Sequence, residues 1–269
     1  MIGRFVAACM FIAVANAATA AEVRQPVGRW AADFSEKRCL ARRSFGTTDE
    51  PLYVYLRRPI LGDVIQLSVA RKGYARLSER LPVRVQFENR PILETSAFVT
   101  DVAETHMRWH VINLPLSAFQ DLPSTANVHV RTEGIKETFA LAGISMILKR
   151  MDECVTHLRR TWHVEESGRS IGVQRAARGD LRSLFSTKDY PDFALMRQDT
   201  ATVRAALLVD ESGTVVDCMI IESEGSPILA GRSCGIIQTR ARFTPAIGLD
   251  GKPARSAAVT PPIIWQIGN

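Results

Sequence analysis

Apolar and polar positions alternate with a period of two in several short stretches of the first half of the chain. The clearest lie at residues 52–56, 65–69, 83–87, 107–114 and 128–130, with turn-forming Gly, Asn, Asp and Pro residues between them. Alternation at this period is typical of strands with one buried face. Residues 117–122 are expected to form a short helix. The pattern therefore predicts a mostly antiparallel β region in this part of the chain.

The period of the pattern changes after residue 140. Apolar side chains then recur at spacings of three and four, at Leu141, Ile144, Leu148, Met151, Val155, Leu158 and Trp162. This spacing places them on one face of a helix of about six turns. The seam of a coiled coil is the alternative, although only about three heptads are present. We expect the helix to pack on the preceding strands, because the sheet needs a cover for its apolar face.

A second set of alternating positions lies near the end of the chain. Residues 203–209 and 218–220 flank a short polar loop that contains Gly213, which predicts a hairpin. Ser226-Pro227 then predicts a helix start, because a capping residue followed by Pro is typical of that position. Ala230, Cys234, Ile237 and Ala241 would form its apolar face. After a turn at Asp250-Gly251, residues 263–267 predict a last strand, so the unit is an antiparallel sheet with one layer of helix. The whole chain is thus expected to be an α+β protein.

Several short sequence motifs in this last part carry a family resemblance. They are Tyr190-Pro191 with Ala194, then Gly213, Ser223 and Gly225, then Phe243 with Pro245-Ala246, and finally Asp250-Gly251-Lys252-Pro253. In this order they resemble the C-terminal domain of the TonB family of energy transducers. The pattern departs from the family at three positions: Glu224 stands for a Ser, Ala230 for an Asp and Ala201 for a Gly. The resemblance covers roughly the last 80 residues, and it says more about fold than about function.

The resemblance implies a way of binding. Domains of this family capture an extended peptide of an outer-membrane receptor by adding it to a sheet edge, where unpaired N–H and C=O groups are available. The strand expected to offer that edge here consists of Ile263, Ile264, Trp265, Gln266 and Ile267. Pro261-Pro262 would remove backbone donors from the start of this strand.

The chain divides into four segments by composition. Residues 1–21 contain one charge, Arg4, then an apolar run and a stretch of small residues, which predicts a secretory signal peptide. An uncleaved inner-membrane anchor is the alternative, although a span needs about 20 apolar residues. Residues 22–165 form the β-rich domain with its C-terminal helix, and the polar, Gly-containing residues 166–185 are expected to be a linker, with a helical turn near residues 173–184. Residues 186–269 form the TonB-like domain. We therefore expect an exported, periplasmic protein.

Four cysteines remain after the signal segment: Cys39, Cys154, Cys218 and Cys234. An even number in an exported chain predicts two disulfides, for which three pairings are possible. Cys218 and Cys234 belong to one small unit, on the second strand and on the helix packed over it, so we pair them. Cys39 is then left with Cys154. Buried free thiols are the alternative, and none of the four has the spacing of metal ligands.

Candidate catalytic or cofactor-binding chemistry is sparse. The formal net charge is +6, but basic residues occur as isolated doublets without interleaved aromatics, so nucleic-acid binding is not expected. His106, His110 and His129 could in principle ligate zinc, although ordinary strand histidines explain them as well. No nucleophile elbow, phosphate-binding loop or metalloprotease motif is present. We expect no enzyme activity and no cofactor.

Three functional hypotheses follow. The favoured one is a periplasmic protein that binds a receptor peptide or another envelope protein, in support of transmembrane transport; direct membrane contact would require retention of residues 1–21. The second is an envelope scaffold that self-associates and transfers no energy. The third is an unrecognised enzyme or metal site in residues 22–165, a region that loosely resembles exported proteins of the invasion-associated locus B type through Trp30, Cys39, Phe139 and the Cys-bearing helix. That looser resemblance implies no particular site.

Overall fold

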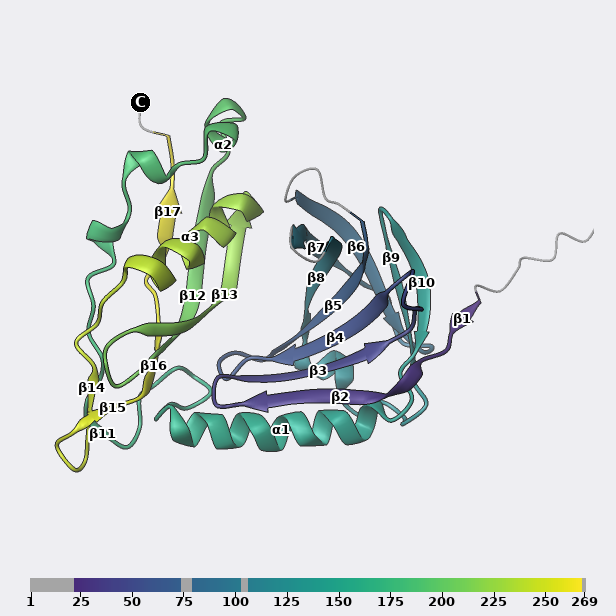
Figure 1. Ribbon diagram of the computed structural model, residues 1–269, viewed down its shortest axis with the longest axis horizontal. Helices are drawn as coiled ribbons and strands as arrows, with labels where there is room; N and C mark the ends of the chain where they lie inside the picture. The colour runs from purple at the N-terminus through teal and green to yellow at the C-terminus, as the bar shows by residue number, and fades with distance from the viewer. Residues whose placement is uncertain (1–21, 74–78, 103–105, 268–269) are drawn as a thin grey trace, which may run out of the picture.

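The computed structural model describes residues 22–73, 79–102 and 106–267. The first part of the chain forms a large curled sheet with a long helix, and the last part forms a smaller sheet with a shorter helix (Figure 1). This arrangement confirms the predicted α+β class. The large sheet contains β1 (Val23–Arg24), β2 (Val27–Ser35), β3 (Arg38–Ser44), β4 (Leu52–Arg58), β5 (Val64–Lys72), β6 (Glu79–Phe87), β7 (Leu93–Val102), β8 (Met107–Pro115), β9 (Asn127–Thr132) and β10 (Ile135–Ala140).

The strands of the large sheet follow the order β1-β10-β9-β6-β7-β8-β5-β4-β3-β2. All neighbours are antiparallel except β1 and β10, which confirms the predicted antiparallel region. The pairs β5–β8 and β6–β9 join strands that are not consecutive in sequence. The β6–β7 hairpin therefore lies between β9 on one side and β8 on the other. A short 3-10 helix, η2 (Leu116–Phe119), stands where a short helix was expected.

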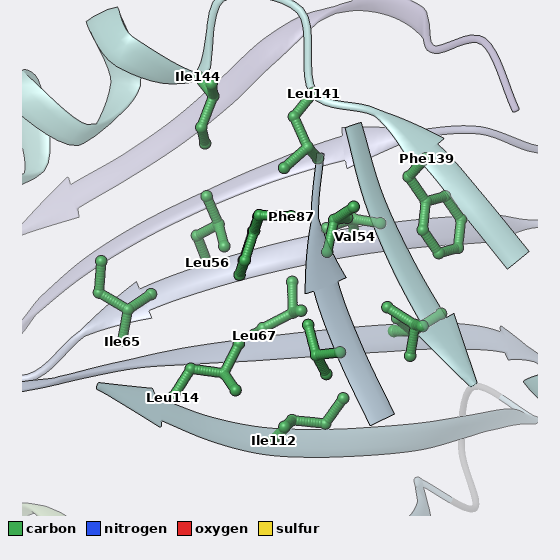
Figure 2. Close-up of a cluster of buried hydrophobic side chains, with 14 of the residues drawn as sticks. Val54, Leu56, Ile65, Leu67, Phe87, Ile112, Leu114, Phe139, Leu141 and Ile144 are labelled. Carbon is green, nitrogen blue, oxygen red and sulfur yellow. The ribbon is translucent and has the colours of Figure 1, made fainter. Parts of the chain in front are cut away.

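The inward-facing side chains of the large sheet form a continuous apolar core (Figure 2). Alternate positions of the strands meet there, including Val54, Leu67, Phe87, Ile112 and Phe139. The ring of Phe87 packs against that of Phe119 with centroids 4.8 Å apart and an interplanar angle of 62°. Because each buried aliphatic or aromatic side chain contributes about 1.5–3 kcal/mol, burial in this core is the main source of stability for the unit.

The long helix, α1 (Ile144–Thr161), covers the sheet with the predicted apolar face and contacts β2 and β3. Its buried residues are Ile144, Ile147, Met151, Val155 and Leu158, so packing on the sheet is confirmed over a coiled-coil seam. The helix has 18 residues, or about five turns, and not six. Gly143, at φ +79°, precedes it in the left-handed region, and Trp162 caps its end, so Leu141 and Trp162 flank the helix.

The smaller unit is built around β12 (Ala201–Val209). On one side of β12 lies β13 (Val215–Gly225), and on the other lie β16 (Ser256–Val259) and β17 (Ile263–Trp265). The helix α3 (Pro227–Arg240) packs across β12 and β13 (Figure 1). The remaining elements are η3 (Arg182–Leu184), η4 (Thr187–Asp189), α2 (Asp192–Met196) and a small sheet of β11 (Val173–Arg175), β14 (Ala246–Gly248) and β15 (Pro253–Ala254). The predicted order of strand, strand, helix and strand is confirmed, with the last strand divided in two.

The two units contact each other through an apolar cluster and an ion pair. Trp162, at the end of α1, and Leu61, in the loop between β4 and β5, belong to the same cluster as Leu208 of β12. Beside this cluster, Nη2 of Arg57 donates to Oδ2 of Asp217 at 2.7 Å, and both side chains are one quarter exposed. The large sheet and the smaller unit therefore share a packed contact at one end.

Both predicted disulfides are present. Cys39 on β3 is joined to Cys154 on α1, with Cα atoms 6.0 Å apart, and Cys218 on β13 is joined to Cys234 on α3, with Cα atoms 5.6 Å apart. The first bridge fastens the helix to the large sheet. The second fastens the helix of the smaller unit to its own sheet.

The structure adds several local features that the sequence pattern did not predict. The strands β2, β3, β7 and β10 had no clear signal, because charged residues interrupt their alternation, as in Arg38–Ser44. The helical turn expected within residues 173–184 is present as η3 at the end of that range, while β11 at its start, which pairs with β14, was not foreseen. Ser226 stands at the N-cap of α3, but its hydroxyl does not cap the helix and donates instead to Oδ2 of Asp199 at 2.8 Å.

Candidate peptide-binding edge

The last strand lies at an outer edge of the small sheet. Ile263, Ile264 and Trp265 pair with Val203, Thr202 and Ala201 of β12, and β16 continues the same edge against the other half of β12. Within the described residues, neither β16 nor β17 pairs with a strand on its outer side. This edge faces away from the large sheet, because β13 occupies the opposite side of β12 (Figure 1).

Two prolines divide the edge into two short strands. Pro261-Pro262 follow Thr260, whose N–H donates to the carbonyl of Ala205 at 2.9 Å and whose hydroxyl accepts from the Ala205 N–H at 3.0 Å. Proline has no N–H and cannot contribute a donor to a sheet ladder. Since β17 ends at Trp265, Gln266 and Ile267 follow the strand and are exposed. The strand that could accept a peptide is thus shorter than the five residues expected from the sequence.

Trp265 anchors the edge strand to the rest of the unit. Its side chain is 6% exposed, and its Nε1–H donates to Oγ of Ser233 on α3 at 2.8 Å. Its ring packs edge-on against Phe185 and Tyr190, with centroids 5.6 and 5.4 Å apart. Successive strand residues face opposite sides, so Ile264 points away from this cluster and is 64% exposed. The edge is therefore fixed in position while its outer side stays accessible.

A groove of about 420 Å³ runs beside the edge. Its walls come from β17, from the residues before it and from the segment that leads into α2; they include Leu181, Phe185, Tyr190, Pro261, Ile263 and Trp265. These side chains are mostly apolar and aromatic, as is common in grooves that receive peptide side chains. An extended segment lying along β17 would have both backbone partners and a place for apolar side chains.

A buried carboxylate, that of Asp189, lies next in the chain to the groove residue Tyr190. Asp189 is 3% exposed and accepts two bonds from the Arg240 guanidinium, at 2.8 and 2.7 Å, while the Ser186 N–H and hydroxyl donate to it as well. These bonds, that from Arg240 first, hold the pKa of the Asp189 carboxyl well below its usual range. Sequence reasoning missed this site; the Ser186-x-x-Asp189 spacing, which resembles a capping box, was the one available signal.

The family-motif residues hold the turns of the unit together. Gly213 and Gly225 have φ values of +81° and +78°, and a Cβ at either position would clash with a carbonyl oxygen, that of Phe243 or that of Thr200. The Phe243 N–H also donates to the Gly213 carbonyl at 2.8 Å, which joins the hairpin to the segment after α3. The remaining motif residues lie apart from one another: Tyr190, Pro191 and Ala194 before β12, Ser223 on β13, Pro245 and Ala246 at β14, and Gly251 in the turn between β14 and β15. Of the motif, only Tyr190 contributes to the groove beside β17.

The three histidines considered as metal ligands have separate surroundings. His106 lies in the turn before β8, His110 is fully buried on β8, and Nδ1 of His129 on β9 is 2.8 Å from the hydroxyl of Thr138. No group of three or more His, Cys, Asp or Glu side chains in the described part of the chain is placed to hold a metal ion. Among the described helices, none combines the length and the apolar character needed to cross a bilayer.

Comparison with known proteins agrees with this geometry. Residues 186–267 match the family model described as the C-terminal domain of Gram-negative bacterial TonB proteins. That range contains β12, β13, α3 and both edge strands, and it confirms the predicted resemblance. Domains of this family act in energy transduction and interaction in the cell envelope, without enzymatic activity of their own. A search of curated proteins finds no match to the chain.

Proposed function

We propose that this protein is exported to the periplasm and that its C-terminal unit binds an extended peptide of an outer-membrane receptor, in support of transmembrane transport. The observation that carries the proposal is the accessible outer side of β17 next to an apolar groove, in the part of the chain that matches the TonB C-terminal family. The two disulfides are compatible with an oxidising compartment.

The peptide adds as a new strand beside β17 in this proposal. Unpaired backbone groups on the outer side of Ile263–Trp265 bond to the peptide backbone, and alternate peptide side chains enter the groove beside Phe185 and Tyr190. Only three residues separate Pro262 from the end of the strand, so few backbone bonds can form there. The affinity is therefore expected to be modest, which suits a contact that must be released.

A titration tests the proposal. The full chain without residues 1–21 is titrated with fluorescent peptides taken from the periplasm-facing segments of outer-membrane receptors. The Ile264→Pro variant removes one backbone donor of the edge, and we expect it to weaken binding at least fivefold. Ile264→Ala removes most of the exposed side chain and keeps the donor, so it is the matched control and should bind nearly as well as the parent.

The folded state of each variant is checked by circular dichroism. A folded Ile264→Pro variant that binds as tightly as the parent would contradict strand addition at β17. Absence of binding by the folded parent to every receptor peptide would favour the envelope scaffold, whose signature is concentration-dependent self-association measured by analytical ultracentrifugation.

A further inference from the structure

A second recess lies between the two units, on the side of the small sheet opposite β17. This interdomain cleft has a volume of about 370 Å³. Its wall on the large sheet is mainly polar and includes Arg57, Gln66, Ser96 and Asn113, whereas its wall on the smaller unit is mainly apolar and includes Met219, Ile221, Pro227 and Ala230. The ion pair of Arg57 with Asp217 and the apolar cluster around Trp162 close one end of the space between the units.

The wall on the smaller unit includes the free edge of β13. Among the described strands, β13 pairs only with β12. Met219, Ile220 and Ile221 all line the cleft, and they lie where the register of β13 against β12 shifts, so that Ile221 has no partner on β12. The outer edge of β13, with its backbone N–H and C=O groups, therefore borders the cleft. Such an edge is a template for one more strand.

Arg80 bridges the cleft at a distance from the closed end. Its Nη1 donates to Oγ of Ser96 on β7 at 3.0 Å, and its Nη2 donates to Oγ of Ser223 on β13 at 2.8 Å. Both acceptors are neutral hydroxyls, and none of the ion pairs within the described residues includes Arg80. A guanidinium group in this position keeps an uncompensated positive charge directed at the cleft, where it would attract a carboxylate.

We propose that the interdomain cleft binds an extended peptide with acidic side chains, which adds as a strand to β13 and places a carboxylate against Arg80. The apolar residues of such a peptide contact Met219, Ile221 and Pro227, and its acidic residues face the polar wall of the large sheet. A free small anion would use Arg80 but not the strand edge, so the juxtaposition of charge and edge favours a peptide. This site is separate from β17 and does not depend on receptor binding there.

The test uses the full chain without residues 1–21 and a fluorescein-labelled heptapeptide of alternating valine and aspartate, with a valine–lysine heptapeptide for comparison. We expect the aspartate peptide to bind and the lysine peptide to bind at least tenfold more weakly. Arg80→Met should weaken binding of the aspartate peptide at least tenfold. Arg84→Met is the matched control, because Arg84 lies on the same strand, is exposed, pairs with Glu94 and does not line the cleft; a change below twofold is expected.

A second pair of variants tests the location without removing a charge. A Cβ at Gly231 or at Gly235 of α3 meets no atom within 4 Å outside its own stretch of helix, so both helical sites accept a side chain. Gly231 lines the cleft and Gly235 does not. Gly231→Phe should therefore fill the cleft and abolish binding of the aspartate peptide, while Gly235→Phe should retain it.

The outcomes separate this site from the edge at β17. Ile264→Pro should leave the affinity for the aspartate peptide unchanged, so failure of receptor binding at β17 leaves this result intact. Failure of the parent to bind the aspartate peptide, equal binding by Arg80→Met, or full binding by folded Gly231→Phe would each overturn the proposal.

Discussion

In the large sheet, apolar side chains from most strands and from α1 fill one enclosed core, whereas the small sheet carries a single helix across β12 and β13. The first unit is stabilised mainly by burial, with Phe87 and its neighbours almost inaccessible to solvent. The second has two smaller apolar clusters, which include Val203 and Leu207, and adds specific contacts: the Cys218–Cys234 bridge, the Asp189–Arg240 pair and the Trp265 anchor.

This difference bears on where the two proposed binding sites lie. Residues that fill a core cannot bind a partner, and the large sheet contributes its outer face as one wall of the interdomain cleft. In the small sheet, the outer edges at β17 and at β13 pair with no further strand among the described residues. Strand addition at either edge, as proposed, would leave the apolar clusters of the unit intact.

We expect the greatest loss of stability from a change in the enclosed core. Phe87→Ala removes a ring that is 1% exposed and packed against Phe119, so it leaves a cavity. We expect it to lower the free energy of unfolding of the large sheet by about 3–5 kcal/mol. Urea unfolding followed by circular dichroism measures this change, and a loss below about 1 kcal/mol would contradict an enclosed core.

The next effect concerns the bridge of the smaller unit. Replacing Cys218 and Cys234 together by Ser opens a loop with a sequence separation of 16 residues, and the chain-entropy estimate predicts a loss of about 3 kcal/mol. Hydrogen exchange should show faster opening of β12 and α3, with little change in β4 and β5. An equal increase in exchange rate in both units would show that they unfold as one body, and it would contradict the difference in stability between the two units.

The stability of the large sheet should depend on pH through His110. His110 on β8 is fully buried. Burial, with a smaller contribution from Arg108, lowers its pKa from 6.5 to about 4, and the backbone at Glu133 and Val69 offsets only part of this. The unfolded chain therefore takes up the proton first, so stability is complete above pH 6.5 and is lost as the pH falls toward 4.

The expected loss between pH 7 and pH 5 is about 2 kcal/mol, and it should be largely absent in His110→Leu. Thermal unfolding at the two pH values measures it. His157→Leu, at an exposed position on α1, is the matched control and should keep the pH dependence of the parent. The same loss in His110→Leu as in the parent would assign the pH dependence to other groups.

We expect the smallest change in stability from Asp189 in the smaller unit, and it falls in a lower pH range than that of His110. Because Arg240 lowers the pKa of Asp189, this carboxyl stabilises the fold above the ordinary aspartate range near pH 4, and the contribution is lost as the pH falls below it. Asp189→Asn should therefore be less stable than the parent at pH 7, by a modest amount since Arg240 is half exposed. The difference should narrow at pH 2.5; a difference that stays constant from pH 7 to pH 2.5 would rule out the charge as its source.

Local pattern was enough to predict some of this architecture. The apolar spacing from Ile144 to Leu158 predicted α1 and its buried face. The motifs Tyr190-Pro191 and Phe243-x-Pro245 predicted the smaller unit through the family resemblance. Strands such as β3 escaped prediction because cross-strand pairing stabilises them, and this is not visible in their own residues. The ion pair of Asp189 with Arg240 and the cleft at Arg80 were missed for the same reason: each joins residues that are distant in sequence.

Backbone hydrogen exchange of the full chain, measured with and without a saturating receptor peptide, shows whether a peptide adds to β17. Strand addition at β17 predicts slower exchange on the outer side of Ile263–Trp265 when the peptide is bound, with β13 unchanged. Binding of the receptor peptide with unchanged exchange throughout β16 and β17 would contradict strand addition at this edge.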